Sequence, residues 1–322
     1  MAIIGHDIHK AKECLLAEKL VGIPTETVYG LAGNAYHSDV VASIFTVKER
    51  PSFDPLIVHT DSLHKAMCFV AQMPPLAAQL AKWFWPGPLT LLLPKRNVVP
   101  DLVTAGSQCV GVRIPNHLLT LRLLQALPFP LAAPSANPFG YISPTTAQHV
   151  ADQLGHKIAY VLDGGPCAVG VESTIVSFDG DKPTIHRLGG ITQSALEQVV
   201  GPVALQLQQA PHRPCVPGAL FAHYAPKKRL IIGALSALIA QYHPIKRVGI
   251  LSFQRYYPEV PVQNQVLLSP KGCLEEAAKN LFQGLRLLDV MDIDLILAAY
   301  VPNHGIGEAV NDRLRRAQSK LS

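Results

Sequence analysis

The sequence predicts an α/β protein of two domains, and three observations lead to this prediction. The chain has 322 residues, which exceeds the usual size of one domain. Strand-like and helix-like segments alternate through residues 6–200, which is typical of a sheet covered by helices. The alternation stops in a proline-rich stretch, Ala210–Pro226, and starts again after it.

In the first half, the apolar residues of His6–Leu20 recur at helical spacing. Apolar runs bounded by proline predict buried strands at Pro55–Thr60 and Leu89–Pro94. The other expected elements of this half are helices Val40–Lys48 and Ala77–Trp85, strand Val110–Pro115, helix Asn116–Leu127 with Asn116 as N-cap, strand Leu131–Ala133, helix Thr145–Gly155, strands Ile158–Asp163 and Ser173–Phe178, and helix Ile191–Val200. Because several of these strands follow one another without a helix between them, we expect a mixed sheet.

Prolines 211, 214, 217 and 226 predict an extended linker, because proline fixes φ and cannot donate to a strand ladder. After Lys227 a new alternation begins and predicts a smaller doubly wound domain. Its expected strands are Leu230–Ile232, Val248–Ser252, Val266–Leu268 and Leu295–Tyr300, and its expected helices are Leu235–Tyr242, Cys273–Val290 and Ile306–Gln318.

The composition excludes disordered and coiled-coil proteins, since 48% of the residues are hydrophobic and only 16% are charged. The net charge of +5 is smaller than the charge expected of a dedicated nucleic-acid coat protein. Residues 1–205 carry 14 Lys and Arg against 15 Asp and Glu, whereas residues 206–322 carry 14 against 8. This asymmetry favours two domains with different partners. The excess of positive charge in residues 206–322 also fits an ordinary solvated surface.

The cysteines and the N-terminus predict a cytoplasmic protein without a membrane segment. No two of the six cysteines lie closer than 41 residues, so no Cys-x-x-Cys metal or redox pair is present. The first 20 residues carry charges throughout and lack the apolar core of a signal peptide. The longest apolar stretch, Leu230–Ala240, is too short to span a bilayer.

Two early motifs combine polar groups with a turn. Pro24–Gly30 places two threonine hydroxyls and a carboxylate where they could orient a small zwitterion, or simply form a capped turn. Lys48 and Arg50 end a predicted helix before Pro51. Two cations on a rigid turn can bind phosphate, but cations at a helix C-terminus also complement the helix dipole.

Two later motifs are rich in small residues. Ala133–Asn137, continued by Ser143–Thr145, can present N–H groups and hydroxyls to an anion, or can be a loop in which Ser143 or Thr145 caps a helix. The glycines between Asp163 and Ser173 allow a ligand close to the backbone, or form a hairpin-like turn. Arg187 precedes a Gly-Gly pair, where a surface salt bridge is the simpler interpretation.

Several familiar signatures are missing from the sequence. It contains no G-x-x-x-x-G-K-[ST] phosphate loop, and Gly305-Ile306-Gly307 lacks the third glycine of a dinucleotide fingerprint. It contains no H-E-x-x-H motif and no Cys/His cluster, so we expect neither zinc nor a dinucleotide. A G-x-S-x-G elbow is also absent.

The order of the motifs is more informative than any one of them. PTETVYGL, KxRPxxxPLIVH, VGVRIP, APSAN…SPT, GVEST and RLGG follow one another from residue 24 to residue 190. This series resembles the threonylcarbamoyl-AMP synthase family. The later HYAP (His223–Pro226) and GIGEAVNDRLRRA motifs resemble the longer, two-domain form of that family. The resemblance implies a YrdC-like twisted mixed open sheet with helices, plus a smaller Rossmann-like C-terminal α/β domain.

The resemblance implies an enzyme, a nucleotidyltransferase that makes L-threonylcarbamoyladenylate from L-threonine, bicarbonate and ATP and releases pyrophosphate. The product would serve the threonylcarbamoyladenosine modification of tRNA. By the same resemblance, the catalytic residues are Lys48, Arg50, Ser135 and Asn137. The threonine-binding residues are Thr27, His59, Arg113, Ser135 and Ser173, and the ATP-binding residues are Lys48, Arg50, Asp54, Cys109, Ala133, Asn137, Ser143, Arg187 and Tyr224.

We therefore expect a catalytic domain over residues 1–205, a linker over the active site at 206–227 and a C-terminal domain over 228–322. Mg²⁺ is expected with ATP. A downstream tRNA-modification transferase is the expected protein partner, and contact with tRNA itself stays open. The family usually has Asn at the position of Asp54 and often Thr at that of Cys109. The rival hypotheses are a non-catalytic RNA-binding module in translation and a transferase that uses another donor, such as carbamoyl phosphate.

Overall fold

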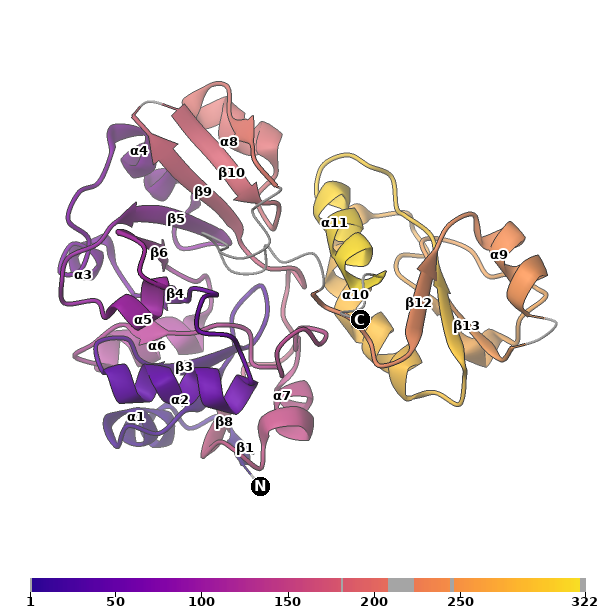
Figure 1. The fold of residues 1–322 in the computed structure, drawn as a ribbon, viewed down its shortest axis with the longest axis horizontal. Coiled ribbons are helices and arrows are strands. Elements are labelled where there is room, and N and C mark those ends of the chain that lie inside the picture. The colour runs from indigo at the N-terminus through magenta and orange to yellow at the C-terminus, as the bar shows by residue number, and fades with distance from the viewer. Residues whose placement is uncertain (1, 181, 208–222, 244–245, 319–322) are drawn as a thin grey trace. The chain divides into compact units, whose positions relative to one another are not determined.

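Figure 1 shows a computed structural model of the chain, which describes residues 2–180, 182–207, 223–243 and 246–318. The chain divides into two compact units. The first unit comprises Met1–Phe139, Pro144–Ala168 and Glu172–Leu220, and the second comprises Gly140–Ser143, Val169–Val171 and Phe221–Ser322. Most of the expected linker, residues 208–222, lies outside the described residues.

In the described part of the first unit, eleven strands form one mixed sheet in the order β1-β8-β2-β3-β7-β4-β6-β5-β9-β10-β11. These strands are β1 Ile3–Gly5, β2 Val21–Ile23, β3 Gly30–Asn34, β4 Ile57–His59, β5 Leu89–Pro94, β6 Cys109–Arg113, β7 Leu131–Ala132, β8 Tyr160–Leu162, β9 Thr174–Asp179, β10 Lys182–Arg187 and β11 Ala204–Leu205. The pairs β4–β6 and β5–β9 are parallel, whereas β5–β6 and β9–β10 are antiparallel. The mixed sheet expected from the sequence is therefore confirmed.

The helices of the first unit lie between these strands in the chain (Figure 1). They are α1 Ile8–Leu16, α2 Ser38–Lys48, α3 Leu63–Ala66, α4 Pro75–Phe84, α5 Asp101–Thr104, α6 Leu118–Ala126, α7 Ala147–Leu154 and α8 Gln193–Val200. One core cluster joins α1 and α6 to the sheet through Leu15, Leu123, Val21 and Tyr160, all at most 1% exposed. Burial of such side chains is the main force that holds the helices to the sheet.

Three local expectations from the sequence are wrong in detail. The N-cap of α6 is His117 and not Asn116, and it makes no side-chain capping bond. Helix α7 is capped by Thr146, whose hydroxyl accepts from the His149 N–H, so neither Ser143 nor Thr145 is the cap. Strand β10 was not predicted, because its polar composition is untypical of a strand and its pairing with β9 specifies it.

The second unit contains a four-stranded, fully parallel sheet in the order β12-β15-β13-β14. Its elements are β12 Arg229–Ile232, α9 Leu235–Tyr242, β13 Val248–Ser252, the 3₁₀ turn η1 Val262–Asn264, β14 Gln265–Leu267, α10 Leu274–Val290, β15 Leu295–Ala298 and α11 Gly307–Gln318. Residues of α9, β13 and β15 form its core cluster, including Ile239, Ile250 and Leu297. This arrangement confirms the smaller Rossmann-like α/β domain.

Two short stretches from within residues 1–205 belong to the second unit. In the first, the Tyr141 hydroxyl donates to Asp289 Oδ2 at 2.7 Å, and Arg286 Nε donates to the Ser143 carbonyl at 3.3 Å. In the second, Gly170 has a φ of +82° and lies so close to α10 that an added Cβ would be 2.4 Å from Lys279 Cα. A side chain at Gly170 would therefore force the backbone apart.

Candidate active site

The sheet of the first unit brings two predicted threonine-binding residues together. His59 ends β4 and Arg113 ends β6, and the two are register partners on these parallel strands. Both side chains are buried, with the residues 3% and 4% exposed. The carboxyl ends of parallel strands are where α/β proteins bind their ligands.

Arg113 has its guanidinium fixed on two sides. Its Nη1 donates to Thr27 Oγ1 at 2.9 Å and its Nε donates to the Gly87 carbonyl at 3.3 Å. Its Nη2 lies 2.8 Å from Glu26 Oε1, but without hydrogen-bond geometry. An arginine fixed in this way presents a pre-organised fork to a carboxylate.

His59 is neutral at physiological pH. Burial lowers its pKa to about 3, and the nearby positive charge of Arg113 contributes to this shift. Its Nδ1 lies 3.3 Å from the Ile57 carbonyl. A neutral imidazole can exchange a hydrogen bond with a hydroxyl, and here it cannot serve as a cation for phosphate.

Ser173 and Arg187, assigned to different substrates by the sequence, contact each other. Arg187 Nη2 donates to Ser173 Oγ at 2.9 Å and Arg187 Nε to the Ser173 carbonyl at 3.0 Å. The Ser173 hydroxyl also lies 2.8 Å from Thr90 Oγ1. Arg187 is only 5% exposed, so its interpretation as a surface salt bridge is wrong.

Lys48 joins two of the predicted motifs. Its Nζ donates to the carbonyls of Ser135 and Asn137, and so ties the end of α2 to the 133–137 loop. The residue is 1% exposed, and burial together with the charge of Arg50 holds its pKa well below the usual value. Lys48 is the last residue of α2, as expected for a cation at a helix C-terminus, but its side chain is buried and bound to the 133–137 loop.

Arg50 and Asp54 form a buried ion pair. Arg50 Nη2 lies 2.9 Å from Asp54 Oδ2, and Arg50 also donates to the carbonyls of Asp54 and Pro55. Burial raises the pKa of Asp54, against the opposing charges of Arg50, Lys48 and Arg187. The charges of the two arginines alone exceed that of the one carboxylate, which suits a polyanionic ligand.

The remaining predicted residues lie elsewhere. Cys109 is exposed at the start of β6, and the buried Ala133 follows β7 with its N–H bonded to the Ile57 carbonyl. Ser143 and Tyr224 belong to the second unit. The Tyr224 ring is 1% exposed, stacks on Phe282 with centroids 5.4 Å apart, and lies 5.2 Å from the Arg313 guanidinium.

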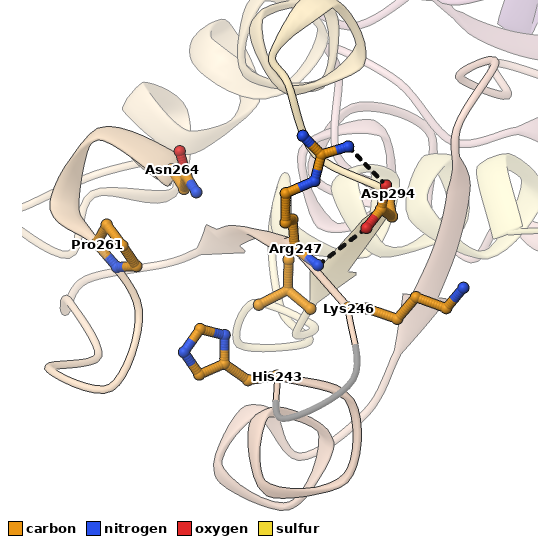
Figure 2. A pocket seen from close by; sticks show the side chains of 7 residues that line it. His243, Lys246, Arg247, Pro261, Asn264 and Asp294 are labelled. Carbon is orange, nitrogen blue, oxygen red and sulfur yellow. Dashed lines mark hydrogen bonds and ion pairs between the residues drawn. The ribbon is translucent and has the colours of Figure 1, made fainter.

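The second unit has a pocket of its own, of about 380 Å³, beside the start of β13. Figure 2 shows Arg247 at this pocket, with its guanidinium and its backbone N–H both directed at Asp294. Asp292 also binds Arg247, so the charge of this cation is already balanced. None of the predicted site residues lines this pocket.

Within the ranges that the structure describes, no three His, Cys, Asp or Glu side chains are grouped so that they could hold a metal ion. Across the same ranges, no helix combines the length and the apolar character needed to cross a membrane. The five described cysteines, all but Cys215, form no disulfide with one another.

One residue of the site lies within a predicted motif, Pro24–Gly30, but was not itself predicted as a site residue. Glu26 is 6% exposed and lies beside Arg113. The signal available in the sequence was a carboxylate between two threonines at the end of an apolar run, which is an unusual place for a solvated charge.

Family models match nearly the whole chain. The model described as "Telomere recombination" matches residues 13–189, and the one described as "Threonylcarbamoyl-AMP synthase, C-terminal domain" matches residues 191–319. The chain is 39% identical to the threonylcarbamoyl-AMP synthase of Bacillus subtilis, over 96% of this chain and 92% of the relative. It is 38% identical to that of Pyrococcus abyssi, over 93% and 90%.

A solved structure has the same fold. The P. abyssi Sua5 protein, crystallised in complex with L-threonine, superimposes with a TM-score of 0.92 and 37% identity. The match covers 99% of this chain and 97% of that one. Both units are therefore shared with a protein that binds threonine.

Proposed function

The chain belongs to the threonylcarbamoyl-AMP synthase family, and from this premise we propose which of its residues carry out the synthesis of L-threonylcarbamoyladenylate from L-threonine, bicarbonate and ATP. The observation that carries the proposal is the buried fork of Arg113, held beside a neutral His59 in the same unit as the basic residues Lys48, Arg50 and Arg187, which all act on Asp54. Such a site offers one place for an amino-acid carboxylate and another for phosphates.

In the threonine half of the site, Arg113 binds the α-carboxylate with its fork. Thr27 supports that arginine through its hydroxyl. The neutral His59 suits the threonine hydroxyl, since it can exchange a hydrogen bond without adding charge. Ser135 and Ser173 are the further proposed threonine ligands.

In the ATP half, Lys48 and Arg50 neutralise phosphate charge, and Ser135 and Asn137 line the reacting centre. Their arrangement supports this role, because Lys48 ties the loop that contains Ser135 and Asn137 to the helix that leads to Arg50. The other proposed ATP ligands are Asp54, Cys109, Ala133, Ser143, Arg187 and Tyr224. The carbamate of threonine attacks the α-phosphate and pyrophosphate leaves, so positioning and charge neutralisation supply most of the catalysis.

We expect Mg²⁺ to enter with ATP, bound to phosphate oxygens and water. The described acidic residues form no cage for it, and Asp54 is bound to Arg50. The proposed domain boundaries remain 1–205, 206–227 and 228–322. A transferase that places the product on tRNA is the proposed partner, and the cytoplasm, with its reduced thiols, is the proposed compartment.

The experiment that tests the proposal measures pyrophosphate release by the full chain. Release should require L-threonine, bicarbonate and ATP together, and the product should contain both AMP and threonine. Release that does not depend on threonine would contradict the assignment of the site. Turnover with carbamoyl phosphate in place of bicarbonate and ATP would support the other transferase, and tight RNA binding without turnover would support the RNA-binding hypothesis.

A further inference from the structure

A buried carboxylate in the threonine half of the site is not used by the mechanism above. Glu26 is 6% exposed, and neither of its carboxylate oxygens has a hydrogen-bond partner among the described residues. Across the described ranges its ion-pair contact is Arg113 Nη2, at 2.8 Å from Oε1. A buried carboxylate without hydrogen bonds costs free energy, so its presence beside a substrate-binding arginine points to a ligand group that completes it.

The titratable groups around Glu26 come from three places in the chain. Arg113 at the end of β6 supplies a positive charge. The imidazole of His117, just before α6, has its pKa lowered by burial, although the Gly164 backbone and the charge of Glu26 oppose that shift. Burial, and then the charge of Glu26, raise the pKa of the Cys167 thiol. At neutral pH the thiol and the imidazole are both uncharged, so Arg113 is the cation that Glu26 faces in the described part of the chain.

Glu26 is not needed to orient Arg113. The guanidinium is already fixed by its hydrogen bonds to Thr27 Oγ1 and to the Gly87 carbonyl. The contact with Glu26 has the distance of an ion pair but lacks hydrogen-bond alignment. Its charge therefore remains available to a substrate group that lies next to the arginine.

The chemistry of the reaction needs such a group. Free threonine carries an ammonium at neutral pH, and an ammonium has no lone pair with which to attack carbon. When the α-carboxylate binds Arg113, the α-nitrogen lies on the adjacent carbon of a short molecule, within reach of a carboxylate that touches the same guanidinium.

We propose that Glu26 is the general base that takes a proton from the threonine ammonium, an inference that rests on the proposed function. The N–H bond breaks, the proton moves to a Glu26 carboxylate oxygen, and the electron pair stays on nitrogen. The neutral amine then attacks the bicarbonate carbon and forms the carbamate with loss of one water. No oxidation or reduction occurs. The proton leaves Glu26 for solvent before the next turnover.

The test compares the pH dependence of kcat in the wild type and in Glu26→Gln, both as the full chain. The rate of pyrophosphate release at saturating ATP is the measured quantity. Near pH 7 we expect kcat to fall by about 100-fold or more, the usual contribution of a general base. As the pH rises from about 7 to about 9.5, the amine loses its proton without help. The kcat of the variant should then rise about tenfold per unit and approach that of the wild type.

Thr27→Val is the matched control, because it removes a hydrogen bond from the same guanidinium without removing a base. It should raise the KM for threonine and should show no selective recovery at high pH. If Glu26→Gln behaves like this control, with a raised KM and a pH-independent loss of kcat, Glu26 only positions Arg113 and the inference is wrong. Wild-type turnover comparable to that of Glu26→Gln at every pH would also overturn it.

Folding of each variant is checked by its thermal melting. If Glu26→Gln does not fold, Glu26→Asp gives the same decision, because it keeps a carboxylate but withdraws it by one methylene. The inference then requires a lower kcat with a pH profile of wild-type shape, and a loss confined to the KM for threonine would overturn it. The proposed function is tested separately, by the dependence of wild-type turnover on threonine.

Discussion

Arg50 and Asp54 form an ion pair that is closed to solvent, with 2.9 Å between Arg50 Nη2 and Asp54 Oδ2 and with side chains 3% and 0% exposed. The family resemblance assigns both Arg50 and Asp54 to the ATP site, although the family usually has Asn at the position of Asp54. In the structure the two side chains form a pair in which the Asp54 carboxylate holds the Arg50 guanidinium in place. Removing either partner therefore has two effects, one on the substrate and one on the fold.

We predict that Arg50→Ala abolishes adenylate formation and also destabilises the protein. Loss of charge-assisted phosphate bonds removes activity, and the loss of the ion-pair partner of the buried Asp54 carboxylate costs about 3–5 kcal/mol of unfolding free energy. The double variant Arg50→Met/Asp54→Leu should recover stability but not turnover. Chemical denaturation and a pyrophosphate assay separate the two effects, and an active single or double variant would remove Arg50 from the mechanism.

Arg113→Lys should raise the KM for threonine and leave the KM for ATP nearly unchanged. A lysine keeps the charge but loses the two-pronged geometry that binds a carboxylate and Thr27 together. The loss of one charge-assisted hydrogen bond corresponds to about a tenfold rise in KM or more. Steady-state kinetics with each substrate varied in turn provide the measurement. An unchanged KM for threonine would show that the carboxylate binds elsewhere.

His59 should make stability depend on pH. Its pKa is about 3 in the folded protein and about 6.5 in the unfolded chain, so between these values only the unfolded chain binds the proton. Stability is therefore complete above about pH 6.5 and falls as the pH drops, by about 2 kcal/mol between pH 6.5 and pH 5.

The variant His59→Gln isolates this contribution, because the other buried histidines titrate equally in both proteins. Urea unfolding at about pH 7.5 and pH 5 should show a smaller loss of stability for the variant than for the wild type, by about 2 kcal/mol. Equal losses in the two proteins would mean that His59 is protonated in the fold.

Tyr224→Ala should lower the melting temperature. The ring is buried against Phe282 and the Arg313 guanidinium, and truncation of such a ring costs about 3 kcal/mol or more. The proposed ATP contact requires a second effect, a higher KM for ATP at a temperature where the variant is folded. Tyr224→Phe is the control, since it keeps the stacking. A melting change without any change in ATP kinetics would leave Tyr224 a purely structural residue.

Much of this protein could be predicted from local sequence. Apolar runs bounded by proline gave β5 at Leu89–Pro94 as it stands in the structure, and β13 and α9 likewise agree residue for residue. Hydrophobic periodicity and the prolines and glycines that end an element are properties of neighbouring residues. They are enough to predict these elements, which burial then stabilises. Strand β10 could not be predicted in this way, because its pairing with β9, and not its own composition, specifies it.

The sequence by itself determined the two α/β units, the order of the motifs and, through that order, the family. Tertiary structure alone decided which side chains meet. The pairing of β4 with β6 places His59 beside Arg113, although 53 residues separate them in the chain. Folding likewise set Glu26 against that arginine, Asp54 against Arg50, and Lys48 against the 133–137 loop. The physical reason is that burial and ion pairing depend on distances in space, whereas motifs record only distances along the chain.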